Sequence, residues 1–552
     1  MTRSFLDPQL LVAGGPHRFT RQVERLLGQL GFHDIVNIDG SGDHGGDLIA
    51  SLNGRLWVFQ AKWKKSGSVD ASAVDEVSTA YDHYGASKAV VVTNAKPSAA
   101  AQKRAGEFAS LGRRVDFWSG AELQELISAA EEHTPLRLRD YQDDAVARLW
   151  SDLRTRHRAL LILATGLGKT VVGGEVIGRH LREHPDRDVL VVAHTKDLVS
   201  QLERALWRHL PKSIKTQVLT GDDKPSDLSG VTCATSASAL TAVQRGWRPG
   251  LIMVDESHHV GEDGTFDDLL HELDASLQFG VTATPWRGDR YDIESRFGAA
   301  SCKLGIEEGM KRGYLAAVDY RLFVDNINWD AVRGSSKHNY SIKELNSRLF
   351  LPQRDEAVVD ALLDAWQRTT NPRGIVFCQT IAHCERLAAL LRQVPTWSRA
   401  SALHAEMPKR ERQQRLLDFR AGRVPILAAV DILNEGVDVP DVNILAFARV
   451  THSRRIFVQQ LGRGLRLREG KDKVIALDFV SDIRRVAALL NLRRQLHVEE
   501  IEVLAQVPQA HISFNDAGAE SLLDQWIKDA ASLETANDEA RLQFLDPDTL
   551  PA

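Results

Sequence analysis

At 552 residues the chain is too long for one hydrophobic core, and a typical size of about 150 residues per domain predicts three or four domains. Its 43% hydrophobic and 26% charged residues are typical of a soluble globular protein, and no long low-complexity tract argues for disorder. Acidic residues number 74 against 69 lysines and arginines, so nucleic-acid binding cannot rest on overall charge and would need local grooves and backbone amides.

The cysteines and the N-terminal segment exclude two further classes of protein. The segment MTRSFLDPQL lacks an apolar signal core, and apolar runs such as residues 159–164 are too short to span a bilayer. We therefore expect a cytoplasmic protein with no membrane partner. The four cysteines have neither CxxC spacing nor clustered histidines, which leaves no case for a zinc or iron–sulfur site: Cys233, Cys302, Cys378 and Cys384.

A helix followed by a β-hairpin is predicted near the start of the chain. Apolar residues recur at helical spacing over residues 19–30, on a segment that carries Glu24 and stops at Gly31. Residues 46–52 and 55–63 then flank the turn pair Asn-Gly, which favours a tight hairpin turn.

The turn of this hairpin fixes which residues face one another. If Asn53 and Gly54 form the loop, Asp47 lies directly across from Gln60, and Lys62 lies two residues further along the same face. Asp47 and the Gln60 oxygen could then hold Mg²⁺, while Lys62 could orient a water molecule against a phosphodiester. An ordinary hairpin with polar residues on its solvent face is the alternative. The other face predicts a core side: Trp57, Phe59, Ala61 and Trp63.

From about residue 17 to 130, the sequence resembles the Mrr-like branch of the PD-(D/E)XK restriction endonuclease fold, in which QxK replaces ExK. The match includes Asp47, residues 60–62, a strand at 89–94, a helix at 102–110, and the segment 115–118 that leads to Glu122-Leu123. The resemblance implies a Mg²⁺-dependent DNA endonuclease with Asp47, Gln60 and Lys62 as catalytic residues. The family often uses an acidic residue on its first helix, and Glu24 sits there. Degeneration into a DNA-binding platform is the competing outcome.

From residue 137 the pattern changes to buried strands that alternate with helices, which is typical of a parallel sheet. The apolar run 159–164 leads into a loop with Gly166 and Gly168, and Lys169-Thr170 begins a helix. Glycines let backbone amides approach phosphates, the lysine reaches the β/γ-phosphates, and the threonine hydroxyl can bind Mg²⁺. Leucine stands where the general phosphate-loop pattern has its first glycine. This loop predicts an ATP site.

Two carboxylates follow a second apolar run, residues 251–254, where ligands of open α/β sheets bind. We expect Asp255 to hold Mg²⁺ through water and Glu256 to position the water that attacks the γ-phosphate. A solvated acidic turn is the alternative interpretation.

Residues 137 to 485 resemble the DExH class of superfamily 2 helicases, with details closest to the restriction-motor (type III restriction) and XPB-like branch. Residues 282–285 match its motif III, and residues 459–466 read QxxGRxxR. The resemblance implies an arginine finger, Arg466, with Arg463 beside the γ-phosphate, because a fixed cation from a second lobe stabilises the transferring phosphoryl group. The other implied residues bind nucleotide (Arg139, Gln142, Thr165, Gly436, Asp438, Gln459), couple the sites (His258, Thr282, Thr284) or contact nucleic acid (Thr195, Thr235).

The expected fold is therefore α/β, with a nuclease-like domain (1–133), two RecA-like parallel-sheet domains (134–320 and 321–485) and an acidic helical tail (486–552). From residue 499 onward, twelve acidic residues stand against two basic ones, which argues against direct DNA contact there. The tail is interpreted either as a solvated helical cap or as a docking segment for a partner protein.

Three functions stay open. The first is an ATP- and Mg²⁺-dependent DNA helicase or translocase with a linked endonuclease, acting on duplex or forked DNA in bacterial restriction or anti-phage defence. The second is a repair or recombination remodeller whose N-terminal domain binds DNA without cutting. The third is an RNA helicase, which the nuclease-like fold argues against.

Overall fold

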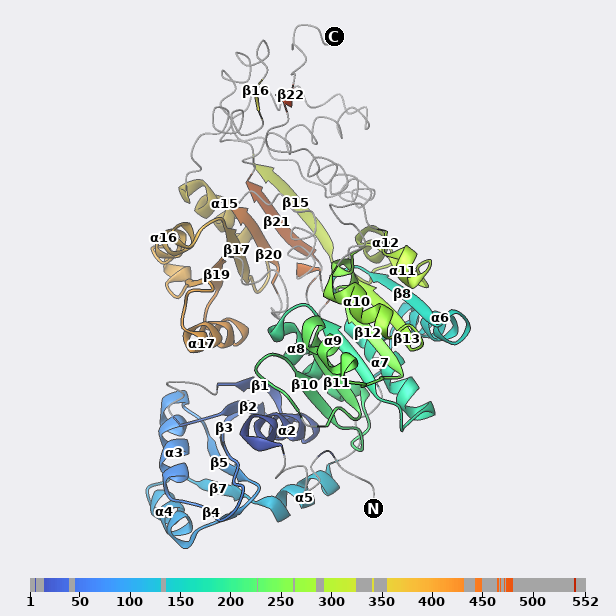
Figure 1. The fold of residues 1–552 in the computed structure, drawn as a ribbon. Coiled ribbons are helices and arrows are strands. Elements are labelled where there is room, and N and C mark those ends of the chain that lie inside the picture. Colours follow the sequence, from blue (N-terminus) through green and yellow to red (C-terminus); the bar gives the residue numbers. More distant parts are fainter. Residues whose placement is uncertain are drawn as a thin grey trace, which may run out of the picture. The chain divides into compact units, whose positions relative to one another are not determined.

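The computed structural model describes residues 5, 14–38, 45–130, 136–225, 227–261, 264–283, 292–323, 340–341, 355–430, 442–448, 464–465, 467, 471, 473–479 and 541–542. These residues form a mixed α/β structure with three large sheets, shown in Figure 1, and the predicted α/β fold class is confirmed. The predicted domain boundaries stay predictions, and the tail lies outside the described residues except for residues 541–542. Within the described ranges, every helix is too short or too polar to cross a membrane.

The chain divides into two compact units. One comprises Met1–Leu161, Thr170–Val281 and Phe297–Ser301, and the other comprises Ile162–Lys169, Thr282–Arg296 and Cys302–Ala552. The endonuclease-like region and most of the first RecA-like region therefore belong to the same unit.

The N-terminal sheet has five strands in the order β1-β2-β3-β5-β7. Strand β2 pairs antiparallel with both β1 and β3. Strand β5 pairs parallel with both β3 and β7. Strands β4 and β6 form a separate, parallel pair. The strands are β1 (His33–Asn37), β2 (Leu48–Leu52), β3 (Arg55–Lys62), β4 (Ser68–Val69), β5 (Lys88–Thr93), β6 (Lys96–Pro97) and β7 (Val115–Trp118).

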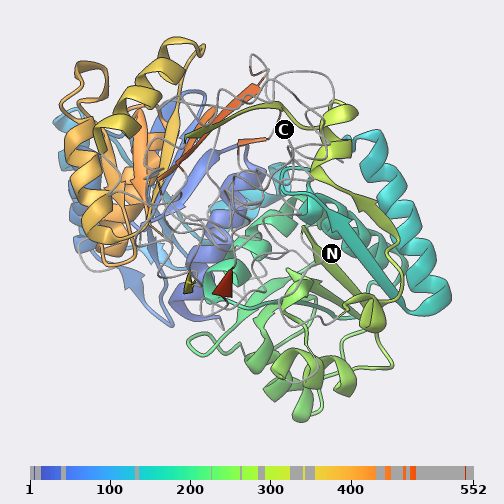
Figure 2. The same ribbon diagram turned by 90° about the horizontal axis from the view of Figure 1, so that it is seen from above.

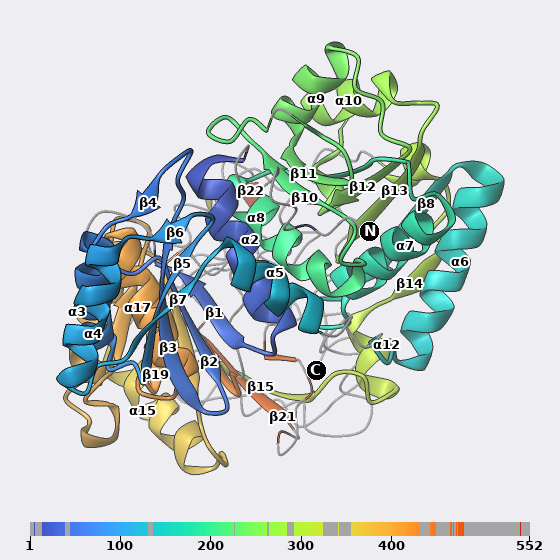
Figure 3. The same ribbon diagram turned by 90° about the horizontal axis from the view of Figure 1, so that it is seen from below.

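Helices cover both faces of this sheet. Figure 3 shows α3 and α4 on one face and α2 and α5 on the other. Apolar residues of α2 and α5, such as Val23 and Leu123, pack with Phe59, Val90 and Val92 of the central strands into one core. The helices are α2 (Gly15–Gln29), α3 (Ser72–Tyr84), α4 (Ala99–Ser110) and α5 (Gly120–Ala129).

The second sheet has seven strands in the order β10-β11-β9-β12-β13-β8-β14. The pairs from β10 to β13 are parallel, as the alternating pattern predicts. Its strands are β8 (Arg158–Leu163), β9 (Val189–Ala193), β10 (Thr216–Leu219), β11 (Val231–Thr235), β12 (Leu251–Asp255), β13 (Leu277–Thr282) and β14 (Cys302–Leu304). The accompanying helices are α6 (Asp140–Arg156), α7 (Lys169–Glu183), α8 (Lys196–Leu206), α9 (Ser236–Gln244), α10 (Thr265–Glu272), α11 (Glu294–Phe297), α12 (Ile306–Lys311), and the short η1 (Trp207–His209) and η2 (Ser257–His259).

The third sheet is parallel throughout, in the order β15-β21-β20-β17-β19-β18. Helices α15 and α16 pack on one face and share a core with the central strands (Figure 2). The strands are β15 (Ala317–Phe323), β17 (Gly374–Cys378), β18 (Ser401–Leu403), β19 (Ile426–Ala429), β20 (Ile444–Ala448) and β21 (Lys473–Phe479). The remaining elements are α15 (Asp355–Gln367), α16 (Ile381–Leu391), η3 (Pro395–Trp397), α17 (Lys409–Arg420), and the pair β16 (Tyr340–Ser341) with β22 (Arg541–Leu542).

Candidate active sites

The N-terminal hairpin has the predicted register. Leu52 pairs with Arg55, and the ladder continues to Leu48 opposite Phe59. Beyond it, the Asp47 side chain is tied to the second strand, because Asp47 Oδ2 accepts the backbone N–H of Ala61 at 2.6 Å. The predicted core side is also confirmed, since the alternate residues pack into the core of the sheet: Trp57, Phe59, Ala61 and Trp63.

Asp47 and Gln60 are buried, so the alternative of polar residues on a solvent face does not hold. Their exposed fractions are 7% and 4%, because α3 covers the face of β3 opposite to α2. Among the described residues, Gln60 Oε1 has no hydrogen-bond partner. A buried acceptor without a donor is destabilising by about 1–3 kcal/mol. An oxygen in this position fits a ligand of a hard cation such as Mg²⁺.

Lys62 has a partner that the sequence analysis missed. Its Nζ lies 2.5 Å from Oε2 of Glu76, which lies on α3. Both side chains are partly exposed, at 29% and 38%. The structure thus adds a second carboxylate beside the predicted group of Asp47, Gln60 and Lys62. The only signal in the sequence was an acidic pair, Asp75-Glu76, on the helix after the QxK strand.

Glu24 is engaged elsewhere. Its Oε1 lies 2.5 Å from Nε of Arg204 on α8, outside the endonuclease-like region. Burial raises the pKa of the Glu24 carboxyl, and the Arg204 guanidinium opposes that rise. The described contacts of Glu24 therefore belong to an ion pair with the RecA-like region.

The phosphate loop has the backbone that its glycines predict. Gly166 and Gly168 have φ values of +94° and +85°, a conformation that side-chain-bearing residues rarely adopt. Helix α7 begins at Lys169, so the loop leads directly into a helix N-terminus, as phosphate binding requires. Thr165 Oγ1 is buried without a hydrogen-bond partner among the described residues. These features fit a bound phosphate chain, with Thr170 placed on the first turn of the helix.

The two predicted carboxylates lie at the end of β12 in the seven-stranded sheet. Asp255 ends the strand and is buried. Glu256 adopts a left-handed conformation, with φ 46° and ψ 52°, which side-chain-bearing residues avoid unless the surroundings enforce it. Its Oε2 lies 3.3 Å from Nδ1 of His258, the residue predicted to couple the two sites.

Two further histidines extend this contact and were missed by the sequence analysis. The ring of His259 lies 4.5 Å from that of His258 and 4.0 Å from that of His194, measured between centroids. His194 directly follows β9 and precedes Thr195. A continuous series of packed rings therefore connects Glu256 with the residue before a predicted nucleic-acid contact.

Thr235 ends β11, and Thr195 lies two residues beyond the end of the neighbouring strand β9. Thr235 pairs with Ala193 in the ladder of β11 and β9. Thr195 Oγ1 accepts the Leu198 N–H at the start of α8, and Thr235 lies at the N-cap of α9, with its hydroxyl donating to Ser238 Oγ. The two hydroxyls therefore stand where helices begin.

Two of the predicted nucleotide-binding residues, Arg139 and Gln142, lie at the start of α6. The Gln142 side-chain oxygen accepts the Arg139 backbone N–H at 3.0 Å, which fixes the turn before the helix. Thr282 is fully buried at the end of β13.

Several predicted residues lie outside the described part of the chain. They are Thr284, Gly436, Asp438, Gln459, Arg463 and Arg466. Across the described ranges, no group of three or more His, Cys, Asp or Glu side chains could hold a metal ion. A metal at the endonuclease-like site would therefore depend on Asp47 together with the Gln60 amide oxygen.

Three family models match separate parts of the chain. Residues 12–127 match a restriction endonuclease model of the Mrr catalytic type, residues 135–287 match the res subunit of type III restriction enzymes, and residues 353–468 match the helicase conserved C-terminal domain. The predicted resemblances of both regions are confirmed. The third match includes the predicted arginines.

Individual proteins are similar over large parts of the chain. The type I restriction enzyme EcoAI endonuclease subunit of Escherichia coli is 25% identical over 66% of this chain and 50% of its own length. The DNA 3'-5' translocase XPB2 of Sulfurisphaera tokodaii is 26% identical over 62% of this chain and 81% of its own length. Four curated relatives, among them the EcoAI subunit, are matched over only 50% to 63% of their length.

One solved structure is similar over nearly the whole chain. An ATP-dependent Type ISP restriction-modification enzyme, LlaBIII, bound to DNA, aligns with 96% of this chain and 39% of its own, with a TM-score of 0.53 and 17% identity. At that identity the similarity concerns the fold alone.

Proposed function

Because the chain combines an Mrr-type restriction endonuclease region with a superfamily 2 helicase core, we propose that it is an ATP-dependent DNA translocase or helicase that carries its own Mg²⁺-dependent endonuclease. Its role would be bacterial restriction or anti-phage defence. The observation that carries the cutting activity is the burial of Asp47 and of Gln60, which lies on the strand that also bears Lys62, together with a Gln60 amide oxygen that has no hydrogen-bond partner in the part of the chain that the structure describes.

In the proposed ATPase site, Lys169 and the amides of Gly166 and Gly168 bind the phosphates. The phosphoryl group of ATP would be transferred to water, and a bound Mg²⁺ would supply positive charge against the charge that develops on it. Thr170 and Asp255 would hold the metal. The strained backbone of Glu256 fixes its carboxylate at the end of β12, a position suited to orienting the attacking water.

Residues of the second RecA-like region complete the proposed site. Arg466 acts as the arginine finger and Arg463 as its γ-phosphate partner, because a planar cation can stabilise the transferring group only from a fixed position. The remaining nucleotide contacts are Thr165, Arg139, Gln142, Gly436, Asp438 and Gln459.

In the proposed endonuclease site, Asp47 and Gln60 would hold Mg²⁺, which would supply a Lewis acid for the phosphodiester. Lys62 orients the attacking water. The Glu76 carboxylate binds the Lys62 ammonium, which restricts a flexible four-carbon side chain to one direction. Glu76 is thus proposed as a positioning residue of this site.

Coupling between ATP and DNA is assigned to residues at the ends of β9, β11, β12 and β13. His258 contacts Glu256, and the packed rings of His259 and His194 continue toward Thr195. Thr195 and Thr235 would contact phosphates of the DNA backbone without reading bases. Thr282 and Thr284 are the other proposed coupling residues.

A DNA repair or recombination remodeller that binds DNA without cutting is the second candidate. The ion pair of Glu24 with Arg204 favours it, because the acidic residue expected on the first helix is engaged outside the endonuclease-like region. Either function is compatible with a partner protein that docks on the acidic tail.

Labelled linear, forked and circular DNA, incubated with Mg²⁺ with and without ATP, tests the proposal. We expect cleavage by the parent protein, and none by a Lys62→Ala variant that keeps its ATPase activity. Equal cleavage by both proteins would contradict the assigned chemistry, and cleavage by neither would favour the remodeller. Stimulation of ATP hydrolysis by duplex DNA over single-stranded DNA and RNA is expected; preferential stimulation by RNA would overturn the DNA assignment.

A further inference from the structure

Helix α2 is buried on two faces. Its apolar residues Phe19, Val23, Leu26 and Leu27 recur at helical spacing and pack into the core of the N-terminal sheet. The polar residues of a surface helix normally face water. Here they are also buried, although they lie outside that core: Arg18, Gln22, Glu24 and Arg25. The polar face of α2 therefore has a protein partner.

That partner is helix α8 of the first RecA-like region. Glu24, which is 2% exposed, forms its ion pair with Arg204 across 180 residues of sequence. One turn earlier, Arg21 lies 2.5 Å from Asp223 and 3.6 Å from Glu203. Arg21 therefore faces two carboxylates and Glu24 faces a guanidinium, so the charges of the two surfaces are complementary.

The segment after α8 contributes backbone contacts. The Arg25 guanidinium donates to the carbonyl oxygens of Ile214 at 2.7 Å and Pro211 at 3.2 Å. It also lies over the ring of Phe5, whose backbone N–H donates to the Lys212 carbonyl. These contacts depend on one relative orientation of the two regions, because a guanidinium presents its donors in a fixed plane.

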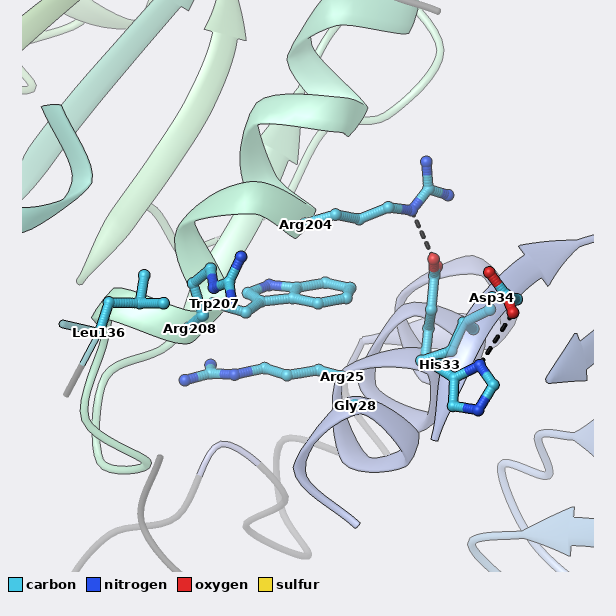
Figure 4. Close-up of a pocket in the computed structure, with 10 residues that line it drawn as sticks. Arg25, Gly28, His33, Asp34, Leu136, Arg204, Trp207 and Arg208 are labelled. Carbon is cyan, nitrogen blue, oxygen red and sulfur yellow. Dashed lines mark hydrogen bonds and ion pairs between the residues drawn. The ribbon is translucent and has the colours of Figure 1, made fainter. Parts of the chain in front are cut away.

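A cavity of about 450 Å³ lies beside the ion pair. Figure 4 shows Arg204 extending from α8 toward α2, with Trp207 and Arg208 on the same side of the cavity. The cavity leaves room for a replaced side chain at position 204. Glutamate and glutamine are shorter than arginine, so either of them fits at this position.

We propose that the polar face of α2 is a docking surface for residues 203–223, and that it fixes the endonuclease-like region against the part of the first RecA-like region that belongs to the same compact unit. Glu24 is then a docking residue and not a metal ligand. Removing one partner of a buried ion pair leaves a charge without compensation, which is strongly destabilising, whereas exchanging both charges preserves the attraction.

The docking can be tested by hydrogen exchange on the full chain, comparing the parent with Arg204→Glu, Arg204→Gln, Glu24→Arg and the exchange E24R/R204E. In the single variants we expect amides of residues 203–223 to exchange at least about tenfold faster, because their protection depends on the docked state. The double variant should return to within about twofold of the parent. Amides of β3 and β9 report whether each region stays folded.

A surface ion pair serves as the matched control. Asp82 and Arg113 lie 3.0 Å apart, are 47% and 41% exposed, and join α3 to the segment before β7. Reversing Arg113 should leave exchange of residues 203–223 unchanged. The docking proposal is overturned if Arg204→Glu and Arg204→Gln leave that exchange unchanged, or if E24R/R204E fails to restore protection.

The functional consequence rests on the proposed function, and a second measurement addresses it. Arg204→Glu should lose the stimulation of DNA cleavage by ATP while DNA-stimulated ATP hydrolysis stays within about twofold of the parent. Unchanged ATP stimulation in a variant that has lost protection would contradict the coupling. If the parent cuts no DNA, the proposed function fails, whereas the exchange experiment still decides the docking.

Discussion

The ammonium of Lys62 and the carboxylate of Glu76 lie 2.5 Å apart, although one comes from strand β3 and the other from helix α3. The lysine alone has four rotatable bonds, and a flexible cation loses entropy when it is fixed. A partner on a separate, packed helix holds it in place before substrate arrives.

Glu76→Gln should slow Mg²⁺-dependent DNA cleavage by roughly 10- to 100-fold, the usual effect of losing a residue that orients a catalytic group. Glu76→Asp should recover part of the rate, since it keeps the charge. The exposed Glu125 on α5 provides the control, because Glu125→Gln makes the same change in charge on the opposite face of the sheet. Equal nicking rates for the parent and both Glu76 variants would remove the positioning role.

Glu256→Gln should bind ATP but hydrolyse it about 10²- to 10⁴-fold more slowly, because the amide can no longer accept a proton from the attacking water. Phosphate release measures hydrolysis, and a fluorescent ATP analogue measures binding. The exposed Glu272 at the end of α10 offers a matched variant, Glu272→Gln, with an expected rate near that of the parent. Near-parental hydrolysis by Glu256→Gln would show that another group positions the water.

Acid should destabilise the first RecA-like region through His180. Burial lowers the pKa of His180 from 6.5 to about 4, and nearby His184 and Arg187 add to this. Below pH 6.5 the unfolded chain binds a proton that the folded protein excludes, so stability falls between pH 6.5 and 4. At about 1.4 kcal/mol per pKa unit, the loss amounts to about 3 kcal/mol.

His180→Leu removes the titrating group from a site that is 2% exposed and next to the Trp150 ring. Urea unfolding at several pH values should therefore give a shallower decline for this variant between pH 6.5 and 4. Above pH 7, the free energy of unfolding should change with pH almost equally in the parent and the variant. If the free energy of unfolding falls equally in both proteins between pH 6.5 and 4, a group other than His180 causes the acid sensitivity.

Phe59→Ala should destabilise the N-terminal region by about 3–5 kcal/mol, because it removes a fully buried aromatic side chain from a packed core. The rings of Phe32 and Trp118 both lie 5.5 Å from that of Phe59, between centroids. Leu111→Ala is the comparison, since Leu111 is 72% exposed and its loss should change stability by less than about 0.5 kcal/mol. Similar unfolding midpoints in urea for both variants would contradict the packing argument.

The sequence predicts contacts that depend on local geometry. Asn53 and Gly54 have φ values of +51° and +73°, the conformation that a tight hairpin turn needs, and this turn alone sets the register that brings Asp47 beside β3. The first helix begins earlier than its apolar pattern indicates, at Gly15, because Pro16 is favourable in a first helical turn although it carries no periodic signal.

Contacts that depend on long-range packing were not predictable. Glu76 meets Lys62 only because α3 crosses β3, and polar residues on a helix give no sign of which of them will be covered. The charged face of α2 looks solvent-exposed in the sequence, yet Glu24 meets a residue 180 positions away. Burial of a polar face becomes visible only when its partner is known.

Helix α8 begins after Thr195 and carries Arg204 near its end. Nine residues at roughly 100° each turn the chain by about 900°, or two and a half turns, so these two side chains point to opposite sides of one short rod. The number of residues between Thr195 and Arg204 therefore sets the angle between their side chains about the helix axis. Inserting one residue between them would rotate Arg204 by roughly 100° away from Glu24 and leave the Thr195 cap intact. We therefore expect α8 to tolerate an insertion or deletion only when it adds or removes about one whole turn, roughly three or four residues.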